Sequence, residues 1–290
     1  MKKLFLTNYE YINNANLPVN LLRRSPQPDY PLHSHEFSEL VIVYAGRGIQ
    51  ITADGDYEVS GGDVFVVDGT MSHGYRDTAE LKLVNLIFDL KNLESPLSDL
   101  PLFPSFHLLF SLTGKLKSTT APRVRFKLDT TQIEHVMTIV DAMEAELLNK
   151  PVGYRMMLTA QFMQLATLLI RCYEHQPQHE PNSQLAGLAE VLGYINRNYR
   201  KKITLTALAS FANMSESSLN RMFQLAVKAS PINYCNQLRI HKAIILLLNS
   251  NLTISEIASA TGFEDSNYFS RLFRQVIGQS PRQYRLHNRQ

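Results

Sequence analysis

The fold of this chain is decided by residues 253–273, which read TISEIASATGFEDSNYFSRLF, because a similar stretch stands about fifty residues earlier. That stretch covers residues 204–223 and reads TLTALASFANMSESSLNRMF. Residues before the turn match at an offset of 49, whereas Leu219 to Phe223 matches Phe269 to Phe273 at an offset of 50. A one-residue insertion in the turn explains the difference, so the C-terminal part of the chain contains an internal duplication.

Each copy has the residue pattern of a helix, a turn and a second helix. In the first copy, Thr204 and Ser215 can cap the two helices, and Asn213 can adopt the left-handed conformation at the turn. In the second copy, Thr253-Ile254-Ser255-Glu256 has the pattern of a capping box and Gly262 stands at the turn. The sequence therefore predicts two helix–turn–helix units.

The second helix of each copy combines an apolar side, which can anchor it, with an outer side of polar residues. Arg pairs bidentately with guanine, and Asn and Gln pair bidentately with adenine. The same outer face occurs twice, with Arg221 and Arg271 in register. We therefore predict a double-stranded DNA interface formed by Glu216, Ser217, Asn220, Arg221 and Gln224 in the first copy and by Ser266, Asn267, Ser270, Arg271 and Arg274 in the second.

A connecting helix is predicted between the two copies. It begins at Ser230-Pro231 and runs to about Asn249. At 1.5 Å per residue it spans roughly 28 Å. Such a spacer could hold two recognition helices about 34 Å apart, one turn of DNA, so that one chain reads two successive major grooves. The apolar face of this helix is expected at Leu238, Ile244, Ile245, Leu246 and Leu248.

The charge of the chain is divided in the same way as its repeats. Residues 1–184 contain 16 Lys and Arg against 21 Asp and Glu, whereas residues 185–290 contain 13 against 5. A basic part beside an acidic part is typical of a nucleic-acid-binding module joined to a domain with another task. The alternative for the basic part is an ordinary solvated surface.

Composition excludes several classes of protein. The 290 residues suit two domains, and no stretch reaches the roughly 18 apolar residues of a membrane span. The first residues lack a secretion-signal pattern, and the two cysteines, Cys172 and Cys235, argue against a disulfide framework or a cysteine metal site. We therefore expect a cytoplasmic protein without a membrane partner.

The N-terminal part is predicted to be a β-sandwich or small barrel followed by helices. Short β-branched runs occur at 40–44, 49–52, 57–59, 64–67 and 81–88, and the first is expected to end at the turn Ala45-Gly46-Arg47-Gly48. Between Thr131 and His175 the apolar period becomes helical, which predicts two helices that cover the barrel or form a dimer seam. The predicted domains are residues 1–175 and 185–290, joined by a polar, proline-containing linker at 176–184.

Residues 33–73 have the spacing at which cupin barrels gather metal ligands. His33, His35 and Glu39 are followed by Gly62 and His73, and residues two apart on a strand share a face. Three readings stay open: a metal-dependent cupin enzyme, a metal-sensing or metal-containing regulator, and a sugar pocket whose polar groups bind hydroxyls. We favour the third, with no cofactor, and expect the effector to be bound by His33, His35, Glu39, Tyr44, Arg47, His73 and Tyr75.

Residues 190–286 closely resemble the AraC/XylS family of bacterial transcription regulators. The runs 254–258, 262–274 and 278–285 follow the family pattern nearly throughout. One departure is Lys228, which stands where the family usually has a helix-ending glycine, and a locally different turn is expected there. Within the family, the sequences of residues 33–43 and 264–267 are most similar to those of the activators of the L-rhamnose genes.

The resemblance implies an α+β protein of two domains: an N-terminal cupin-like β-barrel with a helical hairpin and a C-terminal all-α domain with two helix–turn–helix motifs. It implies a homodimeric, non-enzymatic activator that responds to L-rhamnose or a related carbohydrate. It also places Glu256 and Asp265 where such activators direct acidic side chains toward the sigma subunit of RNA polymerase. Asp265, near which the last recognition helix begins, could equally be a helix cap.

Overall fold

The computed structural model describes residues 4–6, 19–35, 37–53, 55–67, 72–88, 99–112, 124–176 and 183–288. The chain divides into two compact units, one of residues 1–100 and 105–183 and the other of residues 101–104 and 184–290. Most of the expected linker, residues 177–182, lies outside the described residues. Among the helices that are described, none combines the length and the apolar character needed to cross a membrane.

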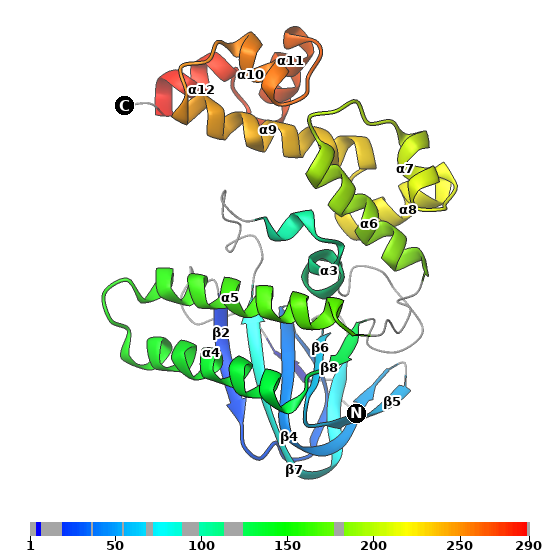
Figure 1. Cartoon of the computed structure of the whole chain (residues 1–290), viewed down its shortest axis with the longest axis vertical. Helices are drawn as coiled ribbons and strands as arrows, with labels where there is room; N and C mark the ends of the chain where they lie inside the picture. Colours follow the sequence, from blue (N-terminus) through cyan, green and yellow to red (C-terminus); the bar gives the residue numbers. More distant parts are fainter. Residues whose placement is uncertain are drawn as a thin grey trace. The chain divides into compact units, whose positions relative to one another are not determined.

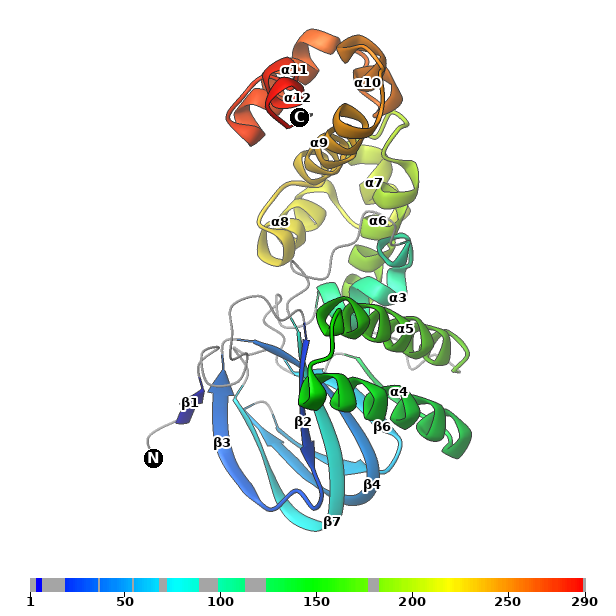
Figure 2. The same cartoon turned by 90° about the vertical axis from the view of Figure 1, so that its left-hand side faces the viewer.

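The first unit is built on one curved sheet (Figure 2). The described strands follow the order β1-β3-β7-β4-β6-β8, with β2 also paired to β7 and β5 to β4. The pairing of β1 with β3 is parallel and the others are antiparallel. The strands are β1 (Leu4–Leu6), β2 (Val19–Arg24), β3 (Tyr30–His35), β4 (Ser38–Thr52), β5 (Gly55–Ser60), β6 (Asp63–Val67), β7 (His73–Phe88) and β8 (Arg125–Lys127).

β4 is one long strand, so the predicted turn at residues 45–48 is wrong. Its register against β7 shifts repeatedly between Val43 and Ile49, which is the signature of a β-bulge. Gly46 has a φ of +73°, and a Cβ on it would lie 1.9 Å from the carbonyl oxygen of Glu80. Glycine therefore lets the two strands approach and bend here, where the sequence pattern alone suggests that the strand ends.

Alternate residues of the long strands are buried on opposite faces of the sheet. Val41, Val43, Phe65 and Tyr75 belong to the cluster on the inner side of the sheet. The two helices predicted from the helical period are present, and they lie side by side against the sheet (Figures 1 and 2). They are α4 (Thr130–Asn149) and α5 (Tyr154–Glu174), preceded by the short turns η1 (Leu100–Leu102), α3 (Pro104–Phe106) and η2 (His107–Ser111).

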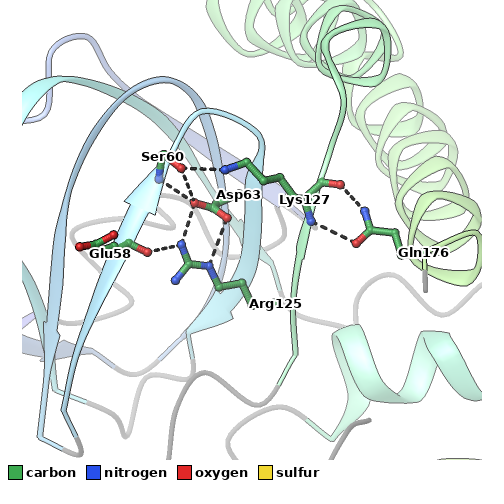
Figure 3. A network of polar contacts seen from close by, with 6 residues as sticks. All are labelled: Glu58, Ser60, Asp63, Arg125, Lys127 and Gln176. Carbon is green, nitrogen blue, oxygen red and sulfur yellow. Dashed lines mark hydrogen bonds and ion pairs between the residues drawn. The ribbon is translucent and has the colours of Figure 1, made fainter. Parts of the chain in front are cut away.

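Buried Asp63 joins several elements of this unit (Figure 3). Its carboxylate accepts hydrogen bonds from the Ser60 backbone N–H at 2.6 Å and from Nη2 of Arg125 at 2.7 Å. Lys127 Nζ donates to Ser60 Oγ at 2.8 Å, and the Gln176 side chain bonds both backbone groups of Lys127. The network therefore fixes β8 and the residues after α5 to the β5–β6 hairpin.

The described part of the second unit is helical, and its elements confirm the duplication. α7 and α10 have seven residues each, and α8 and α11 have twelve each. The turn hydrogen bond from Met214 N–H to Ala209 O has the same 2.9 Å length as its equivalent from Phe263 to Ala258. The helices are α6 (Ser183–Asn198), α7 (Leu205–Phe211), α8 (Glu216–Val227), α9 (Pro231–Asn249), α10 (Ile254–Ala260), α11 (Ser266–Ile277) and α12 (Pro281–Asn288).

The predicted caps are also confirmed. Thr204 and Ser215 accept hydrogen bonds from the backbone of the helices that they precede, and Thr253 forms a full capping box with Glu256. Asn213 takes the left-handed conformation, with a φ of 52°. Local sequence therefore specifies where each of these short helices begins.

The apolar face predicted for α9 is mostly wrong. The fully buried apolar residues are Ile240, Ala243 and Leu247, together with Cys235 near the start of the helix. Ile244 and Leu246 are only partly buried against the same cluster. Because apolar residues run almost without interruption from 243 to 248, periodicity could not select which side of the helix faces the core.

The turn at Lys228 has the same left-handed conformation as its counterpart at Gly278 and differs from it only in hydrogen bonding. Lys228 ends α8 with φ 59° and ψ 26°, and Gly278 ends α11 with φ 85° and ψ −12°. Both residues are therefore left-handed caps, although only glycine adopts this conformation without a steric cost. The left-handed conformation is retained at the expense of local strain, but the hydrogen bond from the Gly278 N–H to Arg274 O has no counterpart at Lys228 within residues 183–288.

Lys228→Gly should therefore stabilise the second unit. We expect the free energy of unfolding to rise by about 0.5–1 kcal/mol, because the steric cost at Cβ disappears while the extra flexibility of glycine offsets part of the gain. Urea denaturation of the full chain measures this. Lys228→Ala is the control and should give no gain, since alanine retains the Cβ. A glycine variant no more stable than the alanine variant would contradict the assignment.

Candidate functional site: a nucleic-acid interface and a buried polar cluster

The predicted DNA-reading residues lie on α8 and α11, and none of them is fully buried. Leu219, Met222 and Phe223 are buried on the opposite side of α8, as are Phe269 and Phe273 on α11. Each helix is therefore anchored by one side and presents the other. The exposed residues are Glu216, Ser217, Arg221, Gln224, Asn267, Arg271 and Arg274, and the partly exposed ones are Asn220, Ser266 and Ser270.

The two central arginines are available for a ligand. Within residues 183–288, neither Arg221 nor Arg271 forms a hydrogen bond or an ion pair through its guanidinium. Two other predicted residues already have local partners: Glu216 Oε1 accepts from the Thr206 hydroxyl at 2.5 Å, and Ser217 Oγ lies 3.1 Å from Ser215 Oγ. Arg221 and Arg271 are thus the most direct candidates for base contacts.

Equivalent aromatic contacts hold the two recognition helices. Phe223 meets Tyr234 edge-on with ring centroids 6.1 Å apart, and Phe273 meets Tyr284 edge-on at 5.7 Å. The two pairs are related by the offset of 50 residues. The packing of the helices is therefore duplicated as well as their outer faces.

Arg239 of α9 connects the two halves of this unit. Its guanidinium donates to the backbone carbonyl oxygens of Tyr199 at 2.7 Å and Lys201 at 2.8 Å. It also lies over the ring of Phe263, 5.5 Å from the centroid. This side chain ties the segment after α6 to the turn of the second helix–turn–helix unit.

Three exposed residues of this face were missed by sequence reasoning. Leu225 and Gln275 follow the arginines by four residues and therefore lie on the same side of their helices. Tyr268 is 42% exposed, and its hydroxyl accepts a hydrogen bond from Asn236. The i+4 spacing was the available signal for Leu225 and Gln275.

Glu256 and Asp265 are the two residues predicted to contact the sigma subunit of RNA polymerase. Both of them cap helices. Glu256 Oε2 accepts from the backbone N–H of Thr253 at 2.7 Å and from its hydroxyl at 2.8 Å, and these bonds lower the pKa of Glu256. Asp265 Oδ1 accepts from the Asn267 N–H at 2.8 Å. Both side chains are exposed, so capping accounts for their presence and leaves them on the surface.

In the first unit, strand pairing brings the cupin-like residues together. His33 of β3 stands directly opposite His73 of β7, and His35 follows on the same side of β3. Nε2 of His35 and Nε2 of His73 each lie 3.6 Å from Oε2 of Glu39. All four residues are buried, with exposures between 1% and 6%.

The electrostatics of this cluster depend on burial. Burial lowers the pKa of His33 to about 4, and the neighbouring His73 adds to the effect. Burial alone would raise the pKa of Glu39, but the proximity of His35 and His73 outweighs it and lowers that pKa to about 2. At neutral pH, His33 is therefore a neutral imidazole and Glu39 a carboxylate.

Further polar groups of this unit are buried without a hydrogen-bond partner. Among the described residues they include Oε1 of Gln50, the hydroxyl of Tyr75 and Oδ1 of Asn85. Gln50 pairs with Tyr75 across β4 and β7, and Nδ2 of Asn85 lies 3.4 Å from Glu39. Burial raises the pKa of Tyr75, so its hydroxyl stays protonated. Buried polar groups normally have partners, which indicates that a ligand or water belongs here.

Tyr44 and Arg47 are not brought together with the histidines, and their grouping with them is corrected. Tyr44 alternates with the inward-facing Val43 and lies under the guanidinium of Arg23, 5.9 Å from it. Arg47 is exposed within the bulged part of β4. The sequence analysis did not predict Gln50 and Asn85 as members of the buried polar group. A single Asn within the mainly apolar run 81–88 was a signal that could have identified Asn85.

Comparison with known families gives the class of the protein. Residues 21–184 match the AraC-like ligand binding domain, and residues 208–287 match a helix-turn-helix domain. A sheet-based ligand-binding domain joined to a duplicated helix–turn–helix domain defines a DNA-binding transcription regulator. The chain belongs to the AraC family of such regulators.

Similar proteins span nearly the whole chain. The HTH-type transcriptional activator RhaR of Pectobacterium atrosepticum is 30% identical over 98% of this chain and 96% of its own length. RhaR of Enterobacter sp. (strain 638) is 28% identical over 99% and 98%. Solved structures include the C-terminal domain of AraT, a response regulator from Geobacillus stearothermophilus, at 34% identity over 35% of this chain and 84% of that one, with a TM-score of 0.34.

Proposed function

We propose that this regulator is a sugar-responsive transcriptional activator whose effector is L-rhamnose or a related carbohydrate. The single observation that carries the proposal is the duplicated recognition helix, with unpaired Arg221 and Arg271 at equivalent exposed positions. Relatives that bear the name transcriptional activator, at 30% identity over nearly the whole chain, support the regulatory role. They do not favour the alternatives of a metal-dependent cupin enzyme or a metal-sensing regulator.

The C-terminal unit is proposed to read DNA by inserting α8 and α11 into successive major grooves. Residues 185–290 carry eight more basic than acidic side chains, which attracts the phosphate backbone. α9 has 19 residues and is therefore roughly 28 Å long, close to one turn of DNA. Arg221 and Arg271 would each pair with a guanine, and the neighbouring polar residues of both helices would extend the contacts.

The N-terminal unit is proposed to bind the effector on the inner side of its sheet. Sugar hydroxyls both donate and accept hydrogen bonds, so they suit the unpaired oxygens of Gln50, Tyr75 and Asn85. Effector binding would shift the regulator between two arrangements by its difference in affinity for them, typically about 1–3 kcal/mol. The 176–184 segment would transmit this between domain 1–175 and domain 185–290.

Three further features belong to this proposal. The protein would act in the bacterial cytoplasm, where the DNA lies. It would act as a homodimer, and the end of α4 and the start of α5 offer exposed apolar side chains for this, Leu148 at 77% and Met156 at 76% exposure. Glu256 and Asp265 would contact the sigma subunit of RNA polymerase from their helix-capping positions.

Tyr75→Phe tests the sensor part of the proposal. The change removes an unpaired buried hydroxyl, so the stability of the sugar-free protein should stay the same or rise. The affinity for the effector should fall by about 2- to 13-fold, the loss of one hydrogen bond of roughly 0.5–1.5 kcal/mol. Thermal unfolding with a panel of monosaccharides measures both, because a ligand at 100 times its Kd stabilises by about 2.7 kcal/mol.

Tyr154→Phe, which alters a half-buried tyrosine on α5, is the matched control and should leave the sugar response unchanged. Two results would count against the sensor assignment. One is a wild-type protein that no monosaccharide stabilises. The other is a Tyr75→Phe variant that responds to the effector as strongly as the wild type does.

A further inference from the structure

The three buried histidines of the first unit converge on one point. Their nearest ring nitrogens all lie within 4.8 Å of one another. The ring centroids of His33 and His73 are 4.2 Å apart, and those of His35 and His73 are 5.1 Å apart. The convergence follows from strand register, since His33 and His73 are directly paired and His35 is two residues along the same strand.

Backbone carbonyl groups select the tautomer of two of these rings. Nδ1 of His35 donates to the carbonyl oxygen of Phe37 at 2.6 Å, and Nδ1 of His33 donates to that of Pro31 at 3.2 Å. With Nδ1 engaged in this way, Nε2 is the ring nitrogen that is left to bind an ion. This arrangement, in which a backbone acceptor orients the imidazole, is usual for histidines that bind metal ions.

Nε2 of His35 has no hydrogen-bond partner among the described residues, although the residue is 1% exposed. The nearest carboxylate oxygen, Oε2 of Glu39, is 3.6 Å away, beyond a normal hydrogen bond, and is itself an acceptor. A buried ring nitrogen and a buried carboxylate oxygen therefore face each other, too far apart for a direct hydrogen bond. A cation between them would bind both.

We infer that His33, His35 and His73 bind a divalent first-row transition metal ion, with Glu39 as a fourth ligand. A cation can bind three imidazole nitrogens and a carboxylate oxygen at once. Three imidazole nitrogens and one carboxylate suit Zn²⁺, Ni²⁺, Co²⁺ or Fe²⁺. Tetrahedral ligands at metal–nitrogen distances of about 2.0–2.1 Å lie about 3.3 Å apart, so ring nitrogens 4.8 Å apart need to approach by about 1.5 Å.

The ion would be a resident part of the sensor, without a catalytic step. Octahedral ions bound by four protein groups keep open positions, which two adjacent hydroxyls of a sugar could fill. That second step rests on the proposed sugar response, whereas the ion site itself does not. Binding of the metal is therefore tested without sugar and without DNA.

The experiment is a Co²⁺ titration of the full chain after removal of metals with a chelator. We expect one Co²⁺ per chain, with visible absorption from imidazole coordination. His33→Gln combined with His73→Gln should weaken binding at least tenfold. The control variant combines His135→Gln and His175→Gln, which alter exposed histidines outside the cluster. It should still bind one Co²⁺ per chain.

A second measurement does not depend on how well the variant folds. Zn²⁺ added to the metal-free wild type should raise its unfolding temperature, because a ligand of the folded state stabilises it by mass action. A wild type that binds no Co²⁺ and is not stabilised by Zn²⁺ would overturn the inference. Equal Co²⁺ binding by the cluster and control variants would also overturn it. Sugar-induced stabilisation of metal-free protein would leave the proposed function intact while refuting a role for the ion in it.

Discussion

Arg271→Ala is expected to weaken binding to a specific DNA site by about 1–3 kcal/mol, or roughly 5- to 150-fold. The guanidinium is exposed, has no protein partner within residues 183–288, and stands at the centre of the outer face of α11. Its removal therefore costs contacts with DNA and no contacts within the protein. Titration of labelled duplex, selected by the protein from a random pool, measures the change at a fixed salt concentration.

Arg221→Ala should have an effect of similar size, because Arg221 is the equivalent residue of α8. Arg155→Ala, an exposed arginine on α5 of the other unit, is the control and should leave specific binding unchanged. Binding to nonspecific duplex should change much less in all three variants. Unchanged specific affinity in both recognition-helix variants would remove Arg221 and Arg271 from the interface.

Phe273→Ala is expected to lower the free energy of unfolding of the C-terminal unit by about 3–5 kcal/mol. Phe273 is fully buried in the cluster that joins α9, α10 and α11, and its ring contacts Phe269 and Tyr284. Stabilities of single domains are typically about 5–15 kcal/mol, so the loss is a large part of the total. Chemical denaturation of the full chain, followed by circular dichroism, measures it.

Phe273→Leu is the matched control, since leucine keeps most of the apolar volume, and we expect a markedly smaller loss. Phe223→Ala removes the equivalent ring of the first copy, which is also fully buried, and should be about as damaging. If Phe273→Ala cost less than about 1 kcal/mol, the anchoring of α11 by its buried side would be wrong.

The helical unit was the more predictable part of the chain. Its helix starts are specified by side chains such as Ser215 and Thr253, which act on backbone groups two or three residues away. Because the unit is duplicated, the helix bounds predicted in one copy could be checked against the equivalent residues of the other. The apolar face of α9 was misassigned because its burial depends on contacts with both repeats and not on local periodicity.

The sensor unit was predicted less well, because its site depends on pairings between distant strands. The spacing of His33, His35, Glu39 and His73 predicted a cluster, and the register of β3 with β7 forms it. The bulge at Gly46 was not visible as such, since a glycine in a strand and a glycine in a turn give the same sequence signal. Tyr44 was grouped with the histidines because it is near them in sequence, whereas its ring lies against Arg23 of β2.

Missing-base footprints on the selected operator are the most direct measurement of the central idea, that one chain reads two neighbouring grooves through equivalent arginines. We predict two sets of essential bases for each chain, centred about 10 base pairs apart. Arg221→Ala should abolish the dependence on one set and Arg271→Ala the dependence on the other. A single set of essential bases, or two variants that lose the same bases, would contradict this account.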